Sequence, residues 1–219
     1  MKSELNYKEE FHRTRGEELT NGIIHIIGAL LGVATLSISC VFAALNHTAC
    51  AVTCCSLFGA MLVFLYVASS IYHLVAEYKA KAFFQLMDHI SIYLLIAGSY
   101  MPYSLLAMSP VKGWVVFGVE WGLALIGIIC ECLLSRRLAD IVSLPVFIGM
   151  GWMLLIDFSH IHASLPSSSF WLLVSGGISY MMGIIFYLMD RVPYMHSVWH
   201  VFVLGGSVCH GLSIIMFMA

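Results

Sequence analysis

Two histidines close to the C-terminus have a spacing that suits metal binding. His196 and His200 are four residues apart, so on a helix they lie one turn apart on the same face. His210 follows ten residues after His200, about 15 Å further along a helix axis, and is too distant to bind the same ion. An isolated pair with this spacing is more often two polar side chains that stack or hydrogen-bond within a helix, so the interpretation depends on the medium around them.

Further polar side chains lie inside otherwise apolar segments earlier in the chain. Glu18, Asn21 and His25 follow an i, i+3, i+7 pattern, which places them on one face of a helix. In the second apolar segment a serine precedes a histidine by four residues, and the third segment carries a carboxylate close to its start. These three residues are Ser69, His73 and Asp88.

The composition decides the medium in which these residues act. Of the 219 residues, 61% are hydrophobic and only 10% are charged, and the mean hydropathy is +0.94. A soluble domain carries roughly 25% charged residues, so the chain is an integral membrane protein. The net charge of −2 does not indicate a partner, and the sequence has no basic stripe that would suggest nucleic acid.

The apolar runs predict an all-α integral membrane protein with seven transmembrane helices. Each run is long enough to cross about 30 Å of hydrocarbon. Residues 1–19 are expected to form a cytoplasmic amphipathic segment, and residues 20–219 a single seven-helix domain. The runs cover residues 20–45, 51–75, 83–107, 113–134, 138–159, 168–189 and 195–218.

The basic residues predict the orientation of the chain. With the N-terminus in the cytoplasm, nine of the ten lysines and arginines fall on the cytoplasmic side and only Lys112 falls outside. This is a strong positive-inside bias. The N-terminus is therefore expected inside and, with an odd number of spans, the C-terminus outside.

This orientation brings the polar residues to one depth. The first, third and seventh helices enter from the cytoplasm and the second leaves into it, so the polar ends of all four lie in the cytoplasmic leaflet. An ionisable group at membrane depth costs about 2.5–3.5 kcal/mol on insertion scales and indicates a functional site. The residues expected there are Glu18, Asn21, His25, Ser69, His73, Asp88, His196 and His200.

Two interpretations of this polar group remain open from the residues alone. Three imidazoles with a nearby carboxylate and hydroxyl match what a catalytic zinc ion needs, including an open position for water. The alternative is a structural polar cluster that holds one helix against another. Zinc acidifies a bound water, and a neighbouring carboxylate can accept its proton, so the first interpretation predicts a catalytic site.

Other ionisable residues have weaker assignments. Glu120 and His210 lie at similar depths in the outer leaflet, which allows a hydrogen-bonded pair between them, and their roles are otherwise open. Asp157 is expected to be solvated at the outer end of the fifth span. Glu131 is expected to reach towards the basic pair that follows it, beginning at Arg136.

Four motifs carry a resemblance to a known family. They are the Glu18, Asn21 and His25 set, Ser69–His73, the run from Asp88 to Tyr100, and the run from His196 to Ser207. Together they resemble the bacterial hemolysin III family, within the progestin and adipoQ receptor (PAQR) superfamily of seven-helix proteins, which is related to alkaline ceramidases. The resemblance covers nearly the whole chain from about Tyr7.

The resemblance implies roles for individual residues. His73, His196 and His200 would be the ligands of Zn²⁺, Asp88 would hold a water on the zinc, and Ser69 would support the ligands. The Glu18, Asn21 and His25 set matches an N-terminal family motif without a defined role. The location implied is the bacterial cytoplasmic (inner) membrane, as a multi-pass protein.

Three functions compete at this stage. The first is a zinc-dependent hydrolase of a lipid amide or ester bond, with a membrane lipid or fatty-acyl substrate and Asp88 as general base. The second is a pore-forming cytolysin or channel, although no polar stripe through the outer leaflet offers an aqueous path. The third is a sensor or receptor of membrane homeostasis with a structural zinc. The sequence specifies neither the substrate nor the oligomeric state.

Overall fold

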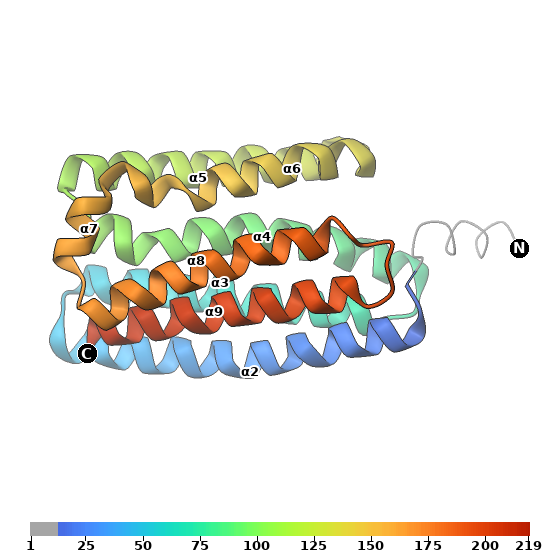
Figure 1. Cartoon of the computed structure of the whole chain (residues 1–219), viewed down its shortest axis with the longest axis horizontal. Coiled ribbons are helices and arrows are strands. Elements are labelled where there is room, and N and C mark those ends of the chain that lie inside the picture. Colours follow the sequence, from blue (N-terminus) through green and yellow to red (C-terminus); the bar gives the residue numbers. More distant parts are fainter. Residues whose placement is uncertain (1–12) are drawn as a thin grey trace, which may run out of the picture.

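The computed structural model describes residues 13–219, and this part of the chain is entirely helical (Figure 1). Residues 1–12 of the expected N-terminal segment lie outside the described residues. Within the described part, seven helical segments are long and apolar enough to cross a membrane, as predicted. The elements are α2 (Arg15–Asn46), α3 (Ala49–Leu74), α4 (Tyr78–Leu106), α5 (Pro110–Leu133), α6 (Arg136–Gly151), η1 (Met153–Asp157), α7 (Phe158–Ser164), α8 (Ser167–Tyr187) and α9 (Met195–Met218).

Helix α2 begins five residues before the apolar run that predicted it. Thr14 and Glu17 form a capping box: the Thr14 N–H donates to Glu17 Oε2 at 2.9 Å, and the Glu17 N–H donates to Thr14 Oγ1 at 3.3 Å. These bonds satisfy backbone donors that are unpaired at the start of a helix. As a result, Glu18 and Asn21 lie in the first two turns of α2.

The fifth span is interrupted, whereas the sequence predicted a continuous helix over residues 138–159. It consists of α6, the 3₁₀ helix η1 and α7. Gly149 and Gly151 precede the interruption, and glycine is a weak helix former; the Leu155 N–H then donates to Trp152 O at 3.1 Å, a three-residue step. The change of helix type redirects the end of this span.

The redirection buries Asp157, which the sequence analysis expected to be solvated. Its carboxylate accepts hydrogen bonds from the backbone N–H of Ser109 at 2.8 Å and from the Ser109 hydroxyl at 2.6 Å. It also pairs with Lys112 Nζ at 2.7 Å. The correction has a physical reason: the start of α5 presents unpaired N–H groups and a positive dipole end, which stabilise a carboxylate.

At the other end, Glu131 meets Arg136 as expected. Its Oε2 is 3.4 Å from Arg136 Nη1, and its Oε1 accepts a hydrogen bond from the Ser143 hydroxyl at 2.5 Å. Polar contacts therefore fasten the α5–α6 side of the protein at both ends.

The helices that carry the polar motifs are close neighbours. Helix α2 packs against both α3 and α9, α4 packs between α3 and α5, and α8 packs against α9. The start of α2, the end of α3 and the start of α9 lie at the same end of the bundle, opposite α7 (Figure 1). Close approach requires glycine at Gly28, where a Cβ would collide with the Tyr66 ring of α3.

The α4–α5 contact allows a test of packing. A Cβ at Gly113 would collide with the backbone carbonyl of Ser104, which cannot rotate away, whereas a Cβ at Gly118 would meet open space. We expect Gly113→Ala to lower the unfolding temperature by several degrees in thermal unfolding of the detergent-purified protein. Gly118→Ala should leave it equal or higher, because alanine favours a helix over glycine by about 1 kcal/mol. Equal unfolding temperatures for the two variants would contradict the close contact.

Candidate metal centre

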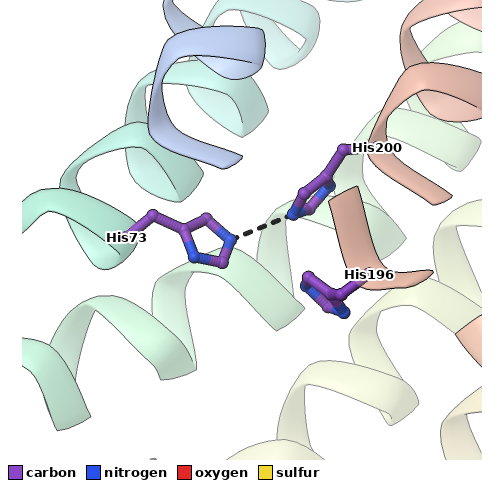
Figure 2. A group of neighbouring side chains, drawn as sticks. All are labelled: His73, His196 and His200. Atoms are coloured by element: carbon purple, nitrogen blue, oxygen red, sulfur yellow. Dashed lines mark hydrogen bonds between the residues drawn. The ribbon is translucent and has the colours of Figure 1, made fainter. Parts of the chain in front are cut away.

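Three histidines from two helices meet at the end of the bundle where α2 begins. His73 comes from the last turn of α3, and His196 and His200 come from the first two turns of α9. One ring nitrogen of each lies within 4.8 Å of the others, and all three side chains are buried. Figure 2 shows the rings of His73 and His200 facing each other, with their Nε2 atoms 3.0 Å apart.

The start of α9 is positioned by α2. Tyr194, the residue before α9, has a left-handed backbone with φ 63°, a conformation that is unfavourable for a bulky residue. Its N–H donates to Glu17 Oε1 at 2.8 Å. The same Glu17 caps α2, so one carboxylate fixes where both helices begin and thereby sets the height of His196 and His200.

A carboxylate of α2 orients the first ligand candidate. Glu18 Oε2 lies 2.6 Å from His73 Nδ1, while Glu18 Oε1 lies 3.1 Å from Lys81 Nζ. A carboxylate on Nδ1 holds the proton there and leaves the lone pair of Nε2 directed into the group of histidines. Sequence analysis gave Glu18 no role, although its shared depth with His73 was a usable signal.

A second carboxylate lies beside the second ligand candidate. Asp190, in the connection between α8 and α9, has its Oδ1 3.1 Å from His196 Nδ1 and 2.7 Å from Arg13 Nη2. Burial by itself would raise the pKa of the Asp190 carboxyl, but the neighbouring His196 and Arg13 outweigh it and hold the pKa well below its ordinary value. Asp190 is therefore ionised at neutral pH. Sequence reasoning missed Asp190 and Arg13, because loop residues have no fixed spacing to the histidines.

The rest of the α2 motif contacts α9. Asn21 Oδ1 accepts a hydrogen bond from the Ser197 hydroxyl at 2.5 Å. The ring of His25 packs edge-on against His200, with 3.9 Å between ring centroids, and neither His25 nitrogen has a hydrogen-bond partner among the described residues. Asn21 and His25 therefore contact α9, while Glu18 contacts His73 on α3.

Asp88 and Ser69 are buried but do not belong to the three-histidine group. Asp88 lies on α4, and its carboxylate is not one of the three groups that share the site. The Ser69 hydroxyl is fully buried and has no hydrogen-bond partner among the described residues. Both side chains remain candidates for a role beside the histidines rather than as ligands.

Comparison with known proteins identifies the family. The sequence profile described as "Haemolysin-III related" matches residues 13–211. The chain belongs to the haemolysin-III-related family. The matched region contains every site residue from Arg13 to His200, and it confirms the resemblance that the four motifs predicted.

Individual members support the same assignment. This haemolysin-III-related protein is 38% identical over 191 residues to Hemolysin-3 of Bacillus cereus, which covers 87% of each chain. It is 37% identical over 191 residues to the Hemolysin-3 homolog of Bacillus subtilis, covering 87% of this chain and 89% of the relative. The human monocyte to macrophage differentiation factor is more distant: 26% identical over 161 residues, 70% of this chain and 66% of the human protein.

The site of this haemolysin-III-related chain has the properties of a metal centre. Buried polar atoms are normally paired, yet His196 Nε2 and His200 Nδ1 have no partner among the described residues. Imidazole nitrogens suit zinc and other transition metals, and a site with three protein ligands leaves a position open for catalysis. A bound metal ion would provide a partner for ring nitrogens that have none within the described part of the protein.

The suggested pair of Glu120 and His210 is not formed, so that hypothesis is wrong. His210 Nε2 lies 3.2 Å from the carbonyl oxygen of Leu173 on α8, and Glu120 is fully buried on α5 without a hydrogen-bond partner among the described residues. The reason is the packing order: α9 lies against α8 and α2, whereas α5 lies beyond α4.

The Glu18 contact predicts a measurable effect on metal binding. Glu18→Gln removes the charged acceptor on His73 Nδ1, so we expect affinity for Zn²⁺ to fall about tenfold or more, as is typical when the hydrogen-bond partner of a ligand histidine is lost. Competition with a chromophoric chelator measures the change. Glu77→Gln, at an exposed acidic position at the start of α4, is the control. Equal affinities for the Glu18 variant and the wild type would refute the orienting role.

Proposed function

We propose that this membrane protein is a zinc-dependent hydrolase that acts on an amide or ester bond of a membrane lipid or fatty-acyl substrate. The observation that carries the proposal is the group of three buried imidazoles, two of which have a carboxylate on Nδ1. A purely structural cluster would pair its ring nitrogens with one another or with the backbone. Here, unpaired nitrogens remain in the group.

His73, His196 and His200 would hold the zinc, and Glu18 and Asp190 would fix two of the rings. When bound, zinc supplies a Lewis acid that polarises the carbonyl of an amide or ester and acidifies water. Neutral imidazole ligands leave the positive charge of the metal largely uncompensated, which favours this chemistry over a purely structural role.

Asp88 is the proposed general base. It is buried on α4 and is not part of the three-histidine group, so in this proposal its carboxylate would accept the proton of the attacking water instead of serving as a ligand. The unpartnered Ser69 hydroxyl, one turn before His73 on α3, would donate a hydrogen bond beside the ligands.

The orientation supports a lipid substrate approached from the cytoplasmic leaflet. The histidines lie on the last turn of α3 and the first turns of α9, at the end of the bundle where α2 begins (Figure 1), and the positive-inside bias of the sequence favours a cytoplasmic location for that end. In a bacterial inner membrane, the head group and first carbons of a lipid in that leaflet would lie at the depth of the histidines.

A channel is the second candidate, and the name Hemolysin-3 of the Bacillus cereus relative favours it. The described half of the bundle away from the histidines has an interior filled by large apolar and aromatic side chains, among them Phe58, Leu62 and Tyr103. A pore would therefore require an assembly of several protomers. A sensor with a structural zinc would retain the histidines without needing Asp88.

Metal content tests the site. The detergent-purified wild type, prepared without chelators, should contain near-stoichiometric zinc by mass spectrometry, and His73→Ala and His200→Ala should lose it because each removes a ligand. His47→Ala, at the opposite end of α2, should retain the wild-type content. A well-folded wild type without zinc would remove the basis for the hydrolase.

Asp88→Asn separates catalysis from metal binding. We expect zinc content to be unchanged and the release of fatty acid from lipid amides or esters to fall at least about 100-fold, because general base catalysis typically contributes 10²–10⁴-fold. Full turnover by this variant would exclude Asp88 as the base.

Conductance in reconstituted bilayers that survives His196→Ala would favour the channel.

A further inference from the structure

His196 Nδ1 lies beside two groups that make opposite demands on it. Asp190 Oδ1, a hydrogen-bond acceptor, is 3.1 Å away, and Arg13 Nη2, a donor, is 3.0 Å away. Arg13 Nη2 also lies 2.7 Å from the same Asp190 oxygen. These three atoms, one from each side chain, form a triangle on the Nδ1 side of the His196 ring.

A neutral imidazole can satisfy only one of these neighbours. It carries one N–H, whereas a guanidinium is always a donor. If Nδ1 carries the proton and donates to Asp190, then the lone pair of Nε2 faces the other histidines and can bind a metal. If Arg13 donates to Nδ1, the proton sits on Nε2 and that nitrogen cannot be a ligand. The two hydrogen bonds therefore correspond to metal-competent and metal-incompetent tautomers of His196.

His73 provides an internal comparison. Its Nδ1 faces the Glu18 carboxylate at 2.6 Å, and the neighbouring cation, Lys81, lies on the other oxygen of that carboxylate at 3.1 Å. A carboxylate on Nδ1 favours the tautomer of His73 that carries its proton there and can bind a metal through Nε2. At His196, a guanidinium lies beside the carboxylate within hydrogen-bond distance of Nδ1.

The remaining contacts of Arg13 allow it to move. Its Nη1 lies 3.4 Å from the Tyr72 hydroxyl, a long hydrogen bond, and its Nε is buried without a partner among the described residues. Withdrawing from His196 Nδ1 would cost Arg13 little, because its shorter contact with Asp190 can be kept.

We propose that Arg13 competes with the metal ion for His196: it is a positioning residue that stabilises the metal-incompetent tautomer, and it leaves Nδ1 when a metal binds. The inference rests on the proposed metal site. The positive charge of Arg13 also repels a metal cation bound nearby. Its charge and its hydrogen bond to His196 Nδ1 therefore both weaken metal binding. Because Arg13 directly precedes the N-cap of α2, metal binding and the position of this segment are linked, and the coupling is reciprocal.

The first test is zinc affinity. The full-length protein in detergent is stripped of metal with a chelator, and Zn²⁺ alone is titrated against a chromophoric competitor. We expect Arg13→Gln to bind Zn²⁺ roughly tenfold more tightly than the wild type, within the usual range for coupled sites. Arg15→Gln, at an exposed position two residues away, should match the wild type, and Asp190→Asn should bind more weakly.

The second test reports the tautomer itself and does not depend on activity. In ¹⁵N-histidine-labelled, metal-free protein at about pH 8, where an ordinary histidine is neutral, His196 should show an unprotonated Nδ1. The signal is assigned by its loss in His196→Gln. In Arg13→Gln, and in zinc-loaded wild type, Nδ1 should be protonated.

Either of two results would overturn the inference: unchanged or weaker zinc binding in folded Arg13→Gln, or a protonated Nδ1 at His196 in the metal-free wild type. Failure of the proposed function is distinguishable from these, because it appears as a wild type that binds no zinc. The tautomer measurement on metal-free protein still tests the contact between Arg13 and His196 in that case.

Discussion

An imidazole placed inside a membrane needs a partner for each ring nitrogen, and this need organises the polar end of the bundle. The Glu18–His73 pair at 2.6 Å joins α2 to α3, and Asp190 beside His196 joins the α8–α9 connection to the same place. Without Glu18, the buried Nδ1 of His73 would lose its hydrogen-bond partner, at a cost of about 1–3 kcal/mol. The hydrogen bonds of the histidine rings therefore help to set the positions of the helices, just as the helices set the positions of the rings.

Helix α2 is the element that makes this possible. It packs against both helices that carry the histidines, and its first two turns supply Glu17, Glu18 and Asn21, each bonded to a different partner. Glycine at Gly28 lets the helix approach the Tyr66 ring of α3 closely. The α5–α6 side of the protein, in contrast, contributes no side chain to the three-histidine group.

The sequence predicted the features that depend on periodicity and hydropathy. Seven spans follow from apolar length, and the shared depth of His73 and the α9 histidines follows from helical spacing combined with chain direction. The family resemblance, not the spacing, implied that these three histidines form one group. The interruption of the fifth span accompanies contacts of Asp157 with Ser109 and Lys112 at the start of α5, and the apolar run does not indicate such contacts. Asp157 was misjudged for that reason.

Other site residues could not be predicted because their roles depend on side-chain direction in three dimensions. Asp190 and Arg13 lie outside the regular helices, where no period fixes which way a side chain points. Glu120 and His210 share a depth, but the packing order of the helices separates them. Depth along the membrane normal is readable from a sequence, whereas rotation and neighbour order around it are not.

The capping box of α2 has a consequence for how such chains can vary. Adjacent helical residues differ by about 100° in direction, and Glu17 and Glu18 face different partners, the Tyr194 backbone and the His73 ring. A single residue inserted or deleted between Glu18 and Gly28, where α2 packs closely on Tyr66 of α3, would rotate both carboxylates away from their partners together. The number of residues that separates these carboxylates from Gly28 is therefore fixed by the contacts at both ends.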